Sequence, residues 1–287
     1  LYMGISCVSC PFMPCLNILR YDERRREAGG ELRILMSILE SEKGCIIYHN
    51  TGLILGSLED YVIGLIPLMD SDKNFAYLHA CLWDAIGDLK SSLWLAFTGR
   101  FRGAMISLRS ALELSVFGVY LSFKAKEYDE EKLEEYINYQ LGIIEELHED
   151  LKRKFQYRFS GMLCELESRG YLPSDIKERC SRLYKELSKY VHTFKGGESY
   201  RAMFKDIESV ARPSSASISM EELWDWYGYF GRVSIAICSV TLRYLAKNRL
   251  ELPERSQNAI GLLSELFEKG PQDSPLPWVD CPFLREL

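Results

Sequence analysis

The chain has 287 residues, of which 47% are hydrophobic and 26% are charged, a composition typical of globular proteins. A chain of this length buries either one large core with appendages or two modest domains. Its formal net charge of −6 argues against a protein that wraps nucleic acid through bulk charge, although a local basic cleft remains compatible with it.

The N-terminal segment does not have the pattern of a membrane or export signal. Residues 1–19 carry no charged side chain, but Pro11 and Pro14 interrupt the run and no basic region precedes it. We therefore expect an irregular start and no membrane association. Residues 20–43 are charged and predict a helix, whereas 44–70 mix β-branched residues with glycines and fit either a hairpin or a helix.

From Phe75 onward the spacing of apolar residues is helical. Leucine, isoleucine and alanine recur every three or four positions over 75–97, and Thr98-Gly99 then ends that helix. A short turn leads into a second helix over 103–124, which predicts an antiparallel pair. Further helices are expected at 127–168, 174–193, 221–249 and 256–269, and a proline-rich tail covers 271–287.

The regular alternation of strand and helix that a doubly wound sheet requires is missing. The fold class is therefore predicted to be all-α, an antiparallel helical bundle. We divide the chain into an N-terminal cysteine-containing segment packed on the core (1–74), the bundle (75–250), and a short helix with a tail (251–287). The aromatic run at 224–230 fits a base-stacking platform but more often belongs to a core.

Nine cysteines are present, an odd number in a chain too long for a disulfide-stapled miniprotein. Four fall singly inside helical patterns, where free cysteine acts as a small buried hydrophobe: Cys81, Cys164, Cys180 and Cys238. This distribution favours the reducing cytoplasm.

An N-terminal cysteine cluster is the one candidate metal site. Cys7, Cys10 and Cys15 could hold zinc if Cys45 or His49 supplied a fourth ligand. Because the second Cys-x-x-Cys of a strong zinc motif is missing, we expect no metal, and no cofactor fingerprint appears.

The helix 103–124 carries two full charges in its interior, Arg109 and Glu113, one turn apart. A charge in a helix that is apolar nearly all round is costly unless it is paired, so we expect both side chains to be largely buried and in contact. Arg102 and Tyr120 lie along the same edge, and Tyr120 is expected to bond near the pair. The pair either fixes helix packing or aims an arginine at a phosphate.

The helix 174–193 carries a different pattern. An apolar stripe runs through Ile176 and Leu187, and Lys185, Ser188 and His192 lie on the opposite side. A histidine beside a cation on an accessible face can do acid–base work while the cation holds a phosphate. An ordinary solvated face explains the same spacing.

Two short segments carry a family resemblance. GRFRGAMISLRSALE at 99–113, followed about seventy residues later by LSKYVH at 187–192, resembles the HEPN-like helical proteins of bacteria and archaea, over roughly 75–250. The resemblance implies a dimeric bundle and, in many members, a metal-independent endoribonuclease of toxin or defence systems. Their motif is an arginine, four to six residues, then a histidine. His192 matches the histidine, but Lys185 stands where arginine belongs, and lysine holds phosphate without bidentate geometry.

Two functions follow as expectations. In the first, the protein acts on RNA, with His192 exchanging the proton and Lys185, helped by Arg109, neutralising the phosphorane charge. In the second, it is a non-catalytic module for dimerisation or protein interaction. RNA, a second copy of the chain, and an antitoxin or defence protein are the expected partners.

Overall fold

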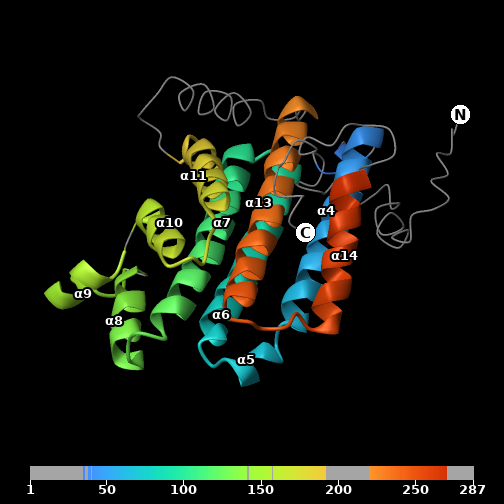
Figure 1. Cartoon of the computed structure of the whole chain (residues 1–287). Coiled ribbons are helices and arrows are strands. Elements are labelled where there is room, and N and C mark those ends of the chain that lie inside the picture. Colours follow the sequence, from blue (N-terminus) through green and yellow to red (C-terminus); the bar gives the residue numbers. More distant parts are fainter. Residues whose placement is uncertain are drawn as a thin grey trace, which may run out of the picture.

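The computed structural model describes residues 41–140, 142–156, 158–191 and 220–269, together with residues 35, 38 and 39. Within these ranges every regular element is a helix, which confirms the all-α class. The helices are α4 (Glu42–Gly64), α5 (Leu68–Ser71), α6 (Phe75–Phe97), α7 (Phe101–Lys124), α8 (Glu130–Gln140), α9 (Glu149–Lys154), α10 (Phe159–Ser168), α11 (Ser174–Ser188), α13 (Met220–Lys247) and α14 (Glu254–Lys269). In Figure 1, α6, α7 and α13 run side by side through the middle, α4 and α14 lie on one flank, and α8 to α11 lie on the other.

The predicted antiparallel pair of α6 and α7 is present. α6 ends in a Schellman motif, in which the Gly99 amide donates to the Ala96 carbonyl at 3.1 Å and the Arg100 amide donates to the Leu95 carbonyl at 2.7 Å. Gly99 adopts a φ of 79°, a conformation that L side chains rarely take. The glycine therefore turns the chain tightly enough to bring α7 back along α6.

The aromatic entry of α13 belongs to the core. The Trp226 indole donates to the Ser92 hydroxyl at 2.8 Å, and that hydroxyl donates to the Ala104 carbonyl, also at 2.8 Å. Tyr227 and Phe230 are buried as well. These hydrogen bonds join α13, α6 and α7. Of the two interpretations of the aromatic run at 224–230, a part of the core is therefore confirmed, rather than a platform for stacking bases.

The ambiguous stretch 44–70 is helical. Ser41 caps α4 by accepting from the Gly44 amide at 3.0 Å. Further along, Gly64 lies against α14, where an added Cβ would come within 2.3 Å of the Ser256 hydroxyl. That hydroxyl donates to the Tyr61 carbonyl at 2.8 Å. α4 and α14, both outside the range expected for the bundle, therefore pack together closely.

Two local predictions are wrong. The single helix expected over 127–168 is broken into α8, α9 and α10, and Gly142 adopts a φ of 69° in the first break. α11 ends at Ser188 rather than near residue 193, with a turn over 189–191. Pro173 is the N-cap residue of α11, and the Ser174 hydroxyl donates to the Glu167 carboxylate at 2.6 Å.

Several expectations fall outside the described residues. They concern the irregular N-terminus, most of the helix at 20–43, Cys7, Cys10, Cys15, His192 and the tail at 271–287. Among the residues that are described, the segments Lys43–Ser71 and Phe101–Lys124 are long and apolar enough to cross a membrane by length and composition. Core helices of soluble proteins share these properties, and half or more of each apolar window is buried here.

Candidate functional site

The two segments that carry the family resemblance lie against each other. The Arg102 Nε, from the start of α7, donates to the Tyr190 carbonyl, just after α11, at 3.0 Å. α7 and α11 are packed together along this contact. The fold thus joins 99–113 to 187–191 although some seventy residues separate them in sequence.

Arg109 makes a second connection between the same helices. Its Nη2 donates to Glu113 Oε1 at 3.1 Å and also to the Tyr184 hydroxyl of α11. Its guanidinium carbon lies 4.5 Å from the centre of the Tyr184 ring, within cation–π range. The other aromatic contact of Tyr184 is a stack on Phe159 at 4.2 Å. Burial, followed by the neighbouring Glu113, raises the pKa of Tyr184, so this phenol stays protonated.

The expected contact between Arg109 and Glu113 is confirmed, and Arg109 is largely buried as expected, whereas Glu113 is more exposed than expected. The exposed fraction is 16% for the Arg109 side chain and 38% for the Glu113 side chain. Tyr184 covers the guanidinium while Glu113 lies at the open edge of α7. Water therefore screens the pair, and its contribution to stability falls to about 0.3–1 kcal/mol rather than that of a buried pair.

The deeply buried charge is Lys124, whose side chain is 2% exposed. Its Nζ donates to Glu165 Oε1 of α10 at 2.5 Å and to the Lys154 carbonyl at the end of α9 at 2.8 Å. Sequence patterning missed this lysine because it is the last residue of α7, where a basic side chain normally reaches solvent. Four aromatic rings surround the ammonium at 5.1 to 5.6 Å: Tyr120, Phe123, Tyr128 and Phe155.

Tyr120 shares the Glu165 carboxylate with Lys124, which corrects the expectation that it bonds near Arg109 and Glu113. Its hydroxyl donates to Glu165 Oε2 at 3.0 Å and accepts from the Gln156 amide at 2.8 Å. The Tyr136 hydroxyl donates to the Gln156 carbonyl at 2.5 Å. Burial raises the pKa of both tyrosines. We call Lys124, Glu165, Tyr120 and Tyr136 the buried lysine cluster, and it ties the α8–α10 region to the bundle.

The polar face of α11 is only partly available for chemistry. The core stripe is confirmed, because Ile176, Cys180, Leu183 and Leu187 are buried. Lys185 is exposed on the opposite face. The Ser188 hydroxyl donates to the Tyr184 carbonyl at 2.6 Å within its own helix, and His192 lies outside the described residues. The structure therefore places Lys185 at the surface but leaves its alignment with His192 a prediction.

The four cysteines expected inside helices, Cys81, Cys164, Cys180 and Cys238, form no disulfide. Burial raises the pKa of Cys81, Cys180 and Cys238 to about 12, so these thiols are inert. Cys164 is exposed, which corrects its assignment to the core. Within the described part of the chain, no group of three or more His, Cys, Asp or Glu residues is placed to hold a metal ion.

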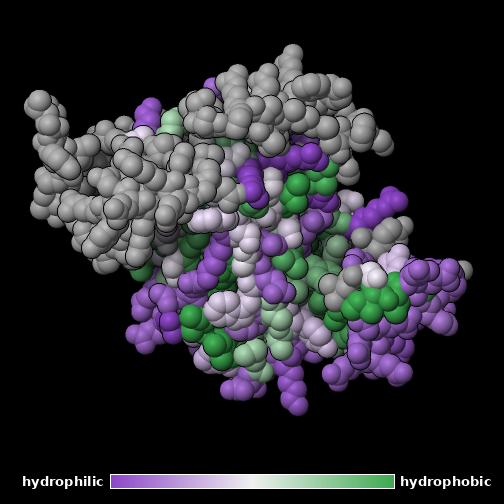
Figure 2. Space-filling view, turned by 180° about the vertical axis from the view of Figure 1, so that it is seen from behind, coloured by the Kyte–Doolittle hydropathy of each residue, from purple (hydrophilic) through white to green (hydrophobic). Residues whose placement is uncertain are grey.

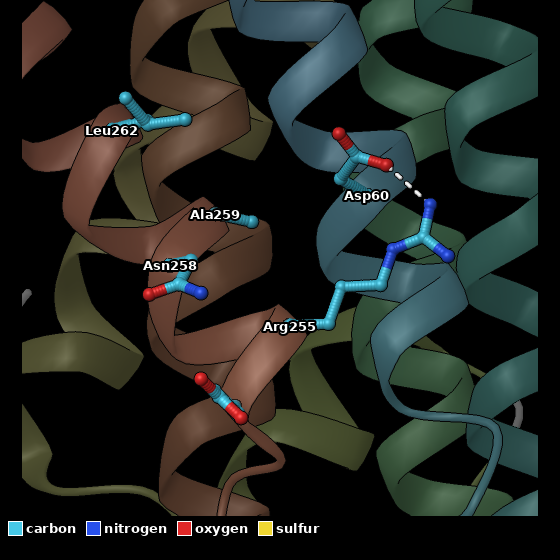
Figure 3. A pocket seen from close by; sticks show the side chains of 6 residues that line it. Asp60, Arg255, Asn258, Ala259 and Leu262 are labelled. Carbon is cyan, nitrogen blue, oxygen red and sulfur yellow. Dashed lines mark hydrogen bonds and ion pairs between the residues drawn. The ribbon is translucent and has the colours of Figure 1, made fainter.

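An open pocket of about 310 Å³ lies between α4 and α14 (Figure 3). Across its mouth, the Arg255 guanidinium donates to Asp60 Oδ1 at 2.6 Å, and Asn258, Ala259 and Leu262 line the α14 side. Both partners of the ion pair are more than half exposed. None of the predicted site residues lines this pocket.

Comparison of the chain with protein-family models, with curated proteins and with solved structures gives no match.

Proposed function

We propose that this chain is an RNA-directed, HEPN-like helical protein that cleaves RNA without a metal ion, in a toxin or defence context. The observation that carries the proposal is the hydrogen bond from Arg102 to the Tyr190 carbonyl, since it joins the two segments on which the family resemblance rests. The exposed cation Lys185 lies on α11, one turn before the end of that helix. His192 follows Val191 directly in the sequence.

The chemistry uses the substrate's own nucleophile. The ribose 2′-oxygen attacks the adjacent phosphorus and the bond from phosphorus to the 5′-oxygen breaks, which leaves a 2′,3′-cyclic phosphate and a 5′-hydroxyl. The 2′-hydroxyl loses a proton and the leaving 5′-oxygen gains one; His192 accepts the first or donates the second, and solvent water exchanges the other. Lys185 stabilises the negative charge on the phosphorane. No oxidant, metal or further reactant is needed for this balance.

Arg109 and Glu113 have a positioning role in this proposal. The Arg109 guanidinium already bonds Glu113 and Tyr184, so its charge is used to hold α11 against α7. We therefore assign the phosphate contact to Lys185 and place Arg109, Glu113 and Ser188 in the support of the helix that carries it.

A non-catalytic interaction module is the second candidate. It is favoured by the internal contacts of Arg109, Glu113 and Ser188, because residues that support a helix can do so without any reaction. Lysine in place of the family's arginine points the same way.

Incubation of the purified chain with mixed RNA in EDTA distinguishes the two. We expect cleavage by the parent, loss of cleavage in His192→Ala, and equal or faster cleavage in Lys185→Arg, which restores the family's cation. An unchanged melting temperature in His192→Ala is the control for folding. RNA left intact by both the parent and Lys185→Arg would favour the interaction module.

A further inference from the structure

The side of α11 that faces away from the core carries two exposed cations, Arg182 and Lys185. Within the described chain, neither side chain makes an ion pair or a side-chain hydrogen bond. At 100° per residue they lie about 130° and 170° from the middle of the core stripe, and about 60° from each other. Both side chains therefore reach into solvent from neighbouring turns of one helix. We call this side of the helix the α11 outer stripe.

Helical spacing offers Arg182 two carboxylates, and neither bonds it. Glu186, four residues later, pairs with the Arg232 guanidinium of α13 at 3.1 Å. Glu178, four residues earlier, is exposed and lies outside ion-pair distance. Like charges on adjacent turns of a helix repel each other about as strongly as opposite charges attract. An anion bound by both Arg182 and Lys185 would remove this repulsion.

The acidic charge of the protein is concentrated elsewhere. Residues 127–150 contain ten Asp or Glu and one Lys, a net charge of −9, so the remainder of the chain is +3 by difference from the total of −6. That segment includes α8 and α9, at the lower end of the flank that has α11 at its upper end (Figure 1). In Figure 2, seen from behind, hydrophilic residues gather at that lower end, on the lower right. The net charge of the chain is therefore compatible with a phosphate-binding surface on α11.

We propose that Arg182 and Lys185 hold two neighbouring phosphates of one RNA strand, an assignment that rests on the proposed function. The Cβ atoms of residues three apart on a helix are about 5–6 Å apart, so two long side chains reach adjacent phosphates of one strand. A guanidinium bonds phosphate in two places, whereas an ammonium acts as a point charge. Arg182 thus supplies the bidentate phosphate contact that Lys185 cannot make.

The remainder of the α11 outer stripe limits the length of RNA that this helix binds. Asp175 and Glu178 lie on the same stripe, nearer to the start of α11, and both are exposed. Their carboxylates repel phosphate. The strand therefore follows α11 as far as Arg182 and leaves the helix there, and α11 contacts two phosphates rather than a longer run.

RNA binding tests this assignment separately from cleavage. In the His192→Ala background the proposed reaction is blocked, and the fluorescence anisotropy of labelled single-stranded RNA gives the Kd at a series of salt concentrations. We expect Arg182→Gln to raise the Kd about fivefold at low salt, the upper range for a pair of exposed charges. The slope of log affinity against log salt should become shallower by about 0.7, the value for one phosphate contact to a single strand.

Lys177→Gln is the matched control. It removes the same charge from the same helix, but Lys177 pairs with Glu167 of α10 at 2.6 Å and lies off the outer stripe. Its Kd and its salt slope should equal those of the parent. An equal loss of affinity in Lys177→Gln and Arg182→Gln would show that binding follows net charge alone, which contradicts the assignment.

Two further variants separate the roles of the two cations. Arg182→Lys should keep the salt slope but bind more weakly than arginine, because it retains the charge and loses the bidentate contact. Arg182→Gln combined with Lys185→Gln should change the slope about twice as much as Arg182→Gln alone, since two phosphates are released.

An unchanged Kd in Arg182→Gln, or no RNA binding by the parent, overturns the assignment. Failure of the proposed reaction gives a different result: RNA is then bound through Arg182 with the expected salt slope but stays uncut by the parent in EDTA.

Discussion

Lys124 and Arg109 show how differently two charges on one helix can be placed. Both lie on α7 and both have a carboxylate partner, yet only Lys124 is removed from water. A buried charge contributes little net stability, but removing its partner is costly because the remaining charge cannot be solvated. We therefore expect the buried lysine cluster to be sensitive to mutation.

Loss of the Glu165 carboxylate should destabilise the protein strongly. We expect Glu165→Ala to lower the free energy of unfolding by about 3–5 kcal/mol, since it removes the carboxylate that bonds the buried ammonium of Lys124 and leaves only Glu127, 4.0 Å away, beside it. Lys124→Met, which removes the charge itself, should cost less. Denaturant unfolding measures both variants, and a midpoint equal to the parent's in Glu165→Ala would show that Lys124 reaches water.

Lys132→Met is the matched control for these variants. Lys132 of α8 pairs with Asp129, just before that helix and close to the cluster in sequence, but both side chains are about half exposed. Its removal should leave the unfolding midpoint unchanged. A loss as large as that of Glu165→Ala would mean that charge on this part of the surface, rather than burial, controls stability.

At the scale of the elements, strong periodicity predicted the helices well and weak local signals did not. α6, α7 and α13 were predictable because their apolar residues recur every three or four positions over many turns. The 127–168 stretch was not: the chain breaks near Gly142, which has a φ of 69°, and the buried Leu133 and Tyr136 pack α8 against the core as a separate helix. The α4 segment stayed ambiguous because the fit of Gly64 against Ser256 is a tertiary contact.

The junction of α7 and α11 should depend on the guanidinium of Arg109. Arg109→Lys keeps the charge but loses the planar group that bonds Glu113 and Tyr184 while lying near the Tyr184 ring. We expect faster amide hydrogen exchange over 174–191 with little change in α6 and α13. Arg255→Lys, at the exposed pair with Asp60, is the control and should leave exchange in α11 unchanged. If Arg109→Lys also left exchange in α11 unchanged, the helix would be held by its apolar stripe alone.

For the whole molecule, the sequence related two segments that the fold brings into contact, but it missed the buried charge of Lys124. The segments 99–113 and 187–192 could be related only through a family resemblance, and the Arg102 contact to Tyr190 is consistent with it. The buried lysine cluster could not be foreseen, because its members come from α7, α8 and α10 and meet only in the folded chain. Lys185 has the exposure that its predicted role requires.

The central claim is that the chain cleaves RNA through the substrate's own 2′-hydroxyl. Its most direct test compares an RNA oligonucleotide that the protein cuts with the same oligonucleotide carrying a single 2′-deoxy sugar at the cut site, both in EDTA. We predict that the all-ribose strand yields a 2′,3′-cyclic phosphate and a 5′-hydroxyl, while the 2′-deoxy strand stays whole at that position. Equal cleavage of both strands, or no cleavage of either by the parent protein, would contradict the account.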